Sequence, residues 1–236
     1  MARTVNPEEY SRKRNEIIDA AQRLVYLKGY ERMTMQDIQD DLGISKGAFY
    51  HYFESKPAVL EALIARGQPG LDQQLAEIAG DPDRSALQKL RAFFDTIDQL
   101  RTEQQAVVIS LLHIWLADEN AIVREKAQEA FVRRRGPLLD AIARQGVGEG
   151  VFTIGDPDRA GVVILSIARG MNDELVRLML AYEQTGDPNA IAEQFVATGS
   201  AMAEAIERVL GAPFGTLNHA TVEEVRAWMS VLRRGA

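Results

Sequence analysis

Residues 34–56 read TMQDIQDDLGISKGAFYHYFESK, and this stretch decides the fold. Thr34 is a favoured capping residue, and the amphipathic segment after it predicts a helix over residues 35–42. Asp37 occupies the third helical position, where its carboxylate completes an acidic variant of the capping box. Gly43 then ends the helix, because glycine adopts the left-handed backbone of a helix C-terminus without steric cost.

A second short helix follows this turn. Ser45 caps it, and we predict that it spans residues 46–53. Two short helices joined by a Gly-Ile-Ser turn form a helix-turn-helix. Phe49 and Phe53 are four residues apart, so they share one face of the helix and should pack on the rest of the head. The residues left on the outer face are Lys46, Gly47, Tyr50 and His51.

This outer face suits a DNA groove. A hydroxyl, an imidazole and an ammonium reach phosphates, and Gly47 permits close approach to base edges. Two alternatives stay open, since Tyr50 can instead cover the small core of the head and His51 can be a solvated surface residue.

Two further helices flank the helix-turn-helix. Asn6 and Pro7 are typical of a helix start, and Gly29 is typical of its end. Ser55 caps the fourth helix and places Lys56 in its first turn. An ammonium beside the free N–H groups of a helix start can share a phosphate with them, so we count Lys56 among the candidate contacts.

The rest of the chain repeats the 3.6-residue period of amphipathic helices. We therefore predict an all-α protein with an N-terminal three-helix helix-turn-helix head joined to a larger helical body. The DNA-binding domain is assigned to residues 1–56 and the body to residues 57–236. A break at residues 67–70 should interrupt the fourth helix and can act as a hinge. The later helices are predicted at 82–101, 103–117, 120–145, 157–182, 188–210 and 221–233.

Composition agrees with a globular protein and excludes several classes. The 236 residues are 46% hydrophobic and include no cysteine, so disulfide scaffolds and thiol chemistry are excluded. Residues 1–66 hold equal numbers of acidic and basic residues, so the whole net charge of −7 lies in the remainder. A neutral head can bind DNA when its basic groups share one face. The longest near-apolar run, residues 106–117, is too short to span a bilayer, and the N-terminus lacks an apolar signal core. We expect a cytoplasmic protein with no membrane partner.

From Ile17 to Leu60 the chain resembles the DNA-binding head of the TetR family of transcriptional regulators. The resemblance rests on a capped second helix, a Gly-Ile-Ser turn, an aromatic third helix and a Ser-Lys start to the fourth. These features are Thr34, Ile38-Gln39, Gly43-Ile44-Ser45, Gly47-Ala48-Phe49-Tyr50-His51-Tyr52-Phe53 and Ser55-Lys56. In Ala48 and Gln39 the chain departs from the family, which usually has Thr and Ala at these places.

The resemblance implies a homodimer that places two heads on successive major grooves of a near-palindromic double-stranded operator. Ser45 and Ala48 are included in the candidate DNA-binding set. The positions that match phosphate contacts are Thr34, Tyr50, Tyr52 and Lys56. The positions that match contacts near base edges are Gln36, Lys46, Gly47 and His51.

The resemblance also implies a ligand-binding and dimerisation body that binds a small-molecule effector, whose chemical class the sequence leaves open. Candidate effector-binding residues are His113, Trp115 and Asn172. A core position is the favoured alternative for His113 and for Trp115, and Asn172 fits either role equally. Helices 157–182 and 188–210 are the candidate dimer interface, and packing within the protomer is an equal alternative for either helix. The second helix carries a stripe on one face with small residues close by, formed by Ala192, Val196, Gly199, Ala203 and Ile206, and by Ala197, Ala201 and Ala205. The basic run at residues 133–135 should be a solvated face.

Two other functions are alternatives to a ligand-responsive repressor. An all-helical enzyme is disfavoured, because His51, His113 and His219 are far apart and no metal or phosphate-binding motif is present. We expect no catalytic residue, metal or cofactor. In the remaining alternative, the body of a DNA-binding protein binds another protein instead of a small molecule. The resemblance favours repression over activation.

Overall fold

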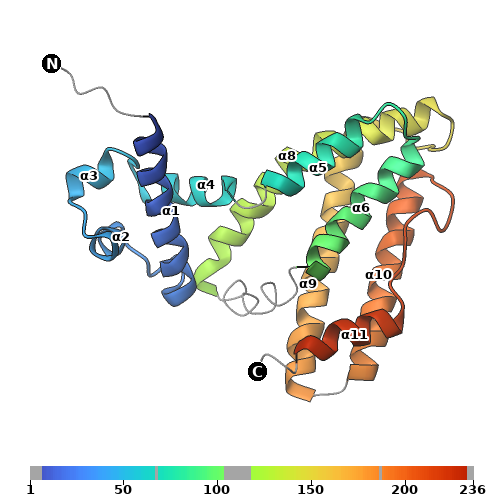
Figure 1. Ribbon diagram of the computed structural model, residues 1–236. Helices are drawn as coiled ribbons and strands as arrows, with labels where there is room; N and C mark the ends of the chain where they lie inside the picture. Colours follow the sequence, from blue (N-terminus) through green and yellow to red (C-terminus); the bar gives the residue numbers. More distant parts are fainter. Residues whose placement is uncertain (1–6, 67–68, 104–117, 186–187, 233–236) are drawn as a thin grey trace. The chain divides into compact units, whose positions relative to one another are not determined.

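The computed structural model describes residues 7–66, 69–103, 118–185 and 188–232 (Figure 1). Every regular element in these ranges is a helix, which confirms the all-α prediction. The elements are α1 (Pro7–Lys28), α2 (Met35–Leu42), α3 (Lys46–Tyr50), α4 (Lys56–Ala65), α5 (Pro69–Gly80), α6 (Ala86–Glu103), η1 (Asp118–Asn120), α8 (Ala121–Gly148), η2 (Pro157–Arg159), α9 (Ala160–Thr185), α10 (Pro188–Leu210) and α11 (Val222–Leu232).

The chain divides into two compact units. The N-terminal unit comprises the described residues of Met1–Pro69 and Leu111–Ala130, and the body comprises those of Gly70–Ser110 and Phe131–Ala236. By its contacts, the N-terminal unit therefore includes α4 and the start of α8 as well as the helix-turn-helix. The functional boundary after residue 56 stays a prediction.

The N-terminal unit has its own apolar core. The stripe of α1 supplies Ile17 and Ile18, α2 supplies Ile38, and α3 supplies Phe49, each at most 2% exposed. Val123 of α8 joins the same cluster from a distant part of the chain. This small core fixes how α2 and α3 lie on α1, which determines the face that the helix-turn-helix presents.

The third helix is shorter than predicted. It spans Lys46–Tyr50 rather than 46–53, and His51 is its C-terminal cap. The amide of Tyr52 donates to the carbonyl of Phe49 at 2.9 Å, a tight turn in place of another helical turn. The reason is the next helix, because its cap Ser55 needs an extended backbone, at φ −157°.

The body is built around a larger core shared by α5, α6, α8, α9 and α10. Its fully buried side chains include Leu75, Phe93, Ile142, Ile164 and Ile206. A second, smaller cluster joins α9, α10 and α11. Figure 1 shows α9 and α10 side by side. No helix in the described parts of the chain combines the length and apolar character needed to cross a bilayer.

Part of the α10 stripe predicted for dimerisation packs inside the protomer instead. Ala192, Ala203 and Ile206 are at most 3% exposed within the body. Ala197 and Ala201 remain exposed. Ala197 and Ala201 are therefore open to a partner subunit, whereas the buried three are not.

The prediction of a solvated basic face at residues 133–135 is wrong for its last member. Arg135 is 7% exposed, and its Nε donates to Asp72 Oδ1 at 2.8 Å. Arg134 Nε donates to the other oxygen of the same carboxylate at 2.6 Å. These charge-assisted bonds fasten α8 to α5, and a run of charges in the sequence does not reveal such a tertiary partner.

Candidate nucleic-acid interface

The turn between α2 and α3 is fixed by glycine. Gly43 has φ +61°, a left-handed conformation that disfavours other residues. Its amide donates to Asp40 O at 3.3 Å, and that of Ile44 donates to Gln39 O at 3.0 Å, so the last carbonyls of α2 are satisfied. The helix-turn-helix predicted from the sequence is thus present.

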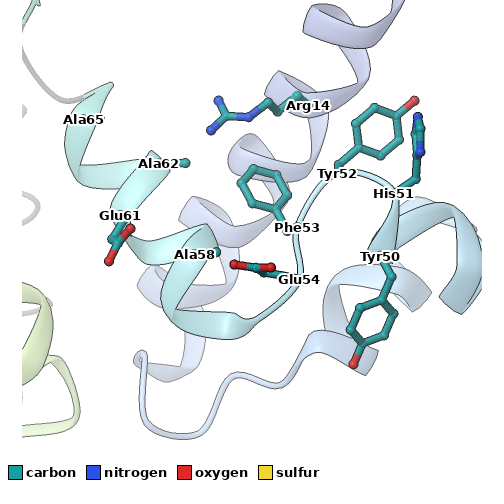
Figure 2. A pocket seen from close by; sticks show the side chains of 10 residues that line it. All are labelled: Arg14, Tyr50, His51, Tyr52, Phe53, Glu54, Ala58, Glu61, Ala62 and Ala65. Carbon is teal, nitrogen blue, oxygen red and sulfur yellow. The ribbon is translucent and has the colours of Figure 1, made fainter. Parts of the chain in front are cut away.

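The third helix has a buried face and an exposed face, as predicted. Phe49 and Phe53 are 0% and 3% exposed, and their ring centroids lie 6.3 Å apart. Tyr50 is 41% exposed, which argues against its alternative role as cover for the core. In Figure 2 its ring points away from that of Phe53. The other exposed residues of this segment are Ser45, Lys46, Gly47, Ala48 and His51.

Three aromatic rings fasten the end of this segment to α1. Tyr10 of α1 lies 4.9 Å from the ring of Tyr52 and 5.6 Å from that of His51, between centroids. His51 and Tyr52 are themselves 5.0 Å apart. Tyr10 therefore supports the rings of two candidate DNA residues, His51 and Tyr52. The sequence does not reveal this role, because no local pattern links Tyr10 to them.

At the start of α2, the carboxylate of Asp37 binds the capping residue Thr34. Thr34 Oγ1 accepts from the amide of Asp37 at 3.1 Å and donates to its Oδ2 at 2.7 Å. The Thr34 amide donates to the same oxygen at 2.7 Å, and Lys28 Nζ lies 2.5 Å from it. Hydrogen bonds from Lys28 and Thr34 lower the pKa of Asp37 from 3.8 to about 2. Both donors of Thr34 are therefore occupied by this carboxylate.

The start of α4 carries a cation instead. Ser55 caps the helix by accepting from the amide of Ala58 at 3.2 Å. Lys56 Nζ donates to Glu31 O at 3.2 Å and lies 4.3 Å from the centroid of the Tyr30 ring. Burial raises the pKa of Tyr30 above its ordinary value, so the ring is neutral and its face attracts the ammonium.

Two glutamines of α2 differ in their surroundings. Gln36 is exposed, and its Nε2 donates to Asp40 Oδ1 at 2.7 Å. Gln39 is only 5% exposed and points into the unit. The exposed Gln36 remains the candidate for base contact. Its bond to Asp40 uses one of the two amide hydrogens, and the second hydrogen and Oε1 are left for a base.

An open groove of about 520 Å³ runs beside the helix-turn-helix, between α1, the segment after α3, and α4 (Figure 2). Arg14 lies over the ring of Phe53 at 4.9 Å inside it. Glu54 and Glu61 also line the groove. Tyr50, His51 and Tyr52 line it as well, so the groove adjoins the candidate DNA contacts. The two carboxylates disfavour a phosphate within the groove itself.

The candidate effector residues are less well placed. His113 and Trp115 lie outside the described residues. Asn172 is exposed on α9. Among the residues that the structure describes, no cluster of His, Asp or Glu could hold a metal ion.

The comparisons with known proteins agree with this geometry. A family model described as bacterial regulatory proteins, tetR family, matches residues 17–63. The chain belongs to the TetR family. It is a DNA-binding transcriptional regulator and not an enzyme.

Individual TetR-family relatives match along most of the chain. YfiR of Bacillus subtilis, an uncharacterised helix-turn-helix regulator, is 26% identical over 82% of this chain and 93% of its own. YerO of the same organism is 36% identical over 78% of this chain and 61% of its own. The solved SmeT–triclosan complex has the same fold, with a TM-score of 0.61, 21% identity, and coverage of 89% of this chain and 97% of SmeT.

Proposed function

We propose that the protein is a repressor that binds a near-palindromic operator as a homodimer in the cytoplasm and is released by a small molecule. The observation that carries the DNA contact is the exposed face of α3. Lys46, Tyr50 and His51 project there from a helix whose other face is buried. From Gly43 to Phe53 the sequence has no acidic residue, so nothing in this segment repels phosphate.

Dimerisation follows from the size of this face. A helix of five residues buries too little surface to bind tightly alone, so two copies should engage half-sites about one helical turn apart, or a multiple of it. We assign the interface to α9 and α10, whose exposed residues include Val162, Val163, Ala197 and Ala201.

An effector-binding body is supported by fold alone. SmeT, which shares the fold, was solved with triclosan. His113, Trp115 and Asn172 remain our candidates for effector contacts, and the chemical class of the effector stays open.

The decisive experiment selects bound fragments from the source genome and footprints them. We expect a protected near-palindrome, and a complex whose mass in sedimentation corresponds to a dimer. Tyr50→Ala should lose binding, whereas Phe214→Ala, which alters an exposed aromatic residue of the body, should retain it in protein shown to be folded. A monomer on DNA at micromolar concentration would refute the dimer, and a failure to select any sequence would refute operator binding.

A further inference from the structure

A buried hydrogen bond links η1, the short helix directly before α8, to the turn after α1. The amide of Tyr30 donates to Asn120 Oδ1 at 2.7 Å, and the two residues are 6% and 2% exposed. They are 90 positions apart in the sequence. Gly29, at φ +80°, ends α1 and turns the chain, so the Tyr30 amide has this distant oxygen as its acceptor.

The same turn holds the ammonium of Lys56. Its Nζ lies over the Tyr30 ring at 4.3 Å and donates to the carbonyl of Glu31 at 3.2 Å. Both partners of the ammonium therefore come from the residues that the Asn120 bond fixes. A shift of the Tyr30 backbone would move the ring and the carbonyl together, and the ammonium with them.

We propose that Asn120 and Tyr30 are positioning residues for the phosphate contact of Lys56. The inference rests on the proposed operator binding and deepens it, since it names the residues that hold one phosphate contact in place.

A double-mutant cycle on the full-length protein tests this, using the selected operator and a series of salt concentrations. Asn120→Ala should lower operator affinity roughly three- to tenfold and reduce the salt slope, by at most about one, the value for one lost phosphate contact. In a Lys56→Met background the same change should have no further effect. Equal losses in both backgrounds, with an unchanged salt slope, would overturn the proposal, because Asn120 would then act on the head in general.

A second pair of variants guards against a folding defect in Asn120→Ala. Tyr30→Phe keeps the ring and the amide, so it should preserve affinity and salt slope. Tyr30→Leu removes the ring face and should lower affinity roughly three- to tenfold, again only while Lys56 is present. Thermal unfolding identifies a temperature at which all variants are folded. Equal affinities for Tyr30→Phe and Tyr30→Leu would refute the role of the ring.

The outcomes separate this proposal from the proposed function. A wild-type protein that selects no operator contradicts the function itself. A wild-type protein that binds its operator, with additive effects of Asn120→Ala and Lys56→Met, contradicts only the positioning role.

Discussion

The starts of α2 and α4 look alike in sequence and differ in electrostatics. Each is capped by a hydroxyl residue, Thr34 or Ser55, that accepts a backbone N–H in its first turn. At α2 the carboxylate of Asp37 takes the remaining donors of the cap. At α4 the first turn has no acid and carries Lys56.

From this difference we assign two roles: the start of α2 is a structural cap, and the start of α4 is the proposed phosphate contact. The N–H groups of a helix start attract an anion, and Asp37 already supplies one to α2 from within the protein. The start of α4 has a cation and no internal anion, so an external phosphate can occupy that place. A cap motif alone therefore does not mark a DNA contact.

The largest expected effect on operator affinity comes from placing an acidic residue in the first turn of α4, as in α2. Lys56→Glu should lower operator affinity ten- to a hundredfold at low salt, because it removes one phosphate contact and adds repulsion. Lys126→Glu is the matched control, since it changes the net charge equally at a lysine of the same unit that pairs with Glu129. Fluorescence anisotropy over a range of salt concentrations measures both. Equal losses would mean that only net charge matters.

Asp37→Asn should remove the carboxylate that binds Thr34 and Lys28 and leave the start of α2 with an uncharged cap. We expect the free energy of unfolding to fall by about 1–2 kcal/mol, because charge-assisted bonds to Thr34 and Lys28 are lost. The depressed pKa means that this stability is present above the ordinary value of 3.8 and disappears as the pH falls toward about 2. Denaturant unfolding between pH 7 and pH 2 should thus show a smaller loss in the variant. Operator affinity of the folded variant should not decrease, and a decrease would contradict the assignment.

The sequence predicts the local parts of this site better than its tertiary parts. Helix starts at Thr34, Ser45 and Ser55 were predictable because a cap and its acceptor lie within one turn. The bond between Tyr30 and Asn120 and the burial of Arg135 were not, because each depends on a partner far along the chain. The early end of α3 is a local effect by contrast, since the extended cap of the next helix, Ser55, follows Tyr50 closely in the chain.

The sequence pattern of the body has the same limit, because it does not show which element an apolar helix face packs against. The periodicity of α10 predicts its apolar face correctly, because Ala192 and Ile206 are buried. It cannot say whether that face packs within the protomer or against a second copy, since both bury the same residues. The contacts with α9 and α11 settle this for the buried stripe.

Gln36→Ala should affect sequence preference at α2 rather than general affinity. A base contact by Gln36 should be worth about 1 kcal/mol at one base pair per half-site, the low end of such contacts, because the bond to Asp40 already uses one amide hydrogen and restricts how the amide can turn. Gln99→Ala in α6 is the matched control, since Gln99 makes the same kind of i,i+4 bond, to Glu103. Binding to operators with each base pair substituted measures the preference. A uniform loss across all operators would assign Gln36 to phosphate instead.

The smallest expected effect compares the two caps directly. Thr34→Ala and Ser55→Ala should each cost about 1 kcal/mol of unfolding free energy, since both lose a cap.

The effects of these two variants on operator affinity, measured where both are folded, should differ. The Thr34 hydroxyl hydrogen is donated to Asp37, so its loss removes no donor that faces DNA. The Ser55 hydroxyl hydrogen has no acceptor among the described residues and can reach a phosphate beside Lys56, so its loss should weaken binding roughly two- to fivefold. A larger loss for Thr34→Ala would show that phosphate displaces Asp37 from the start of α2, and the two helix starts would then play the same role on DNA.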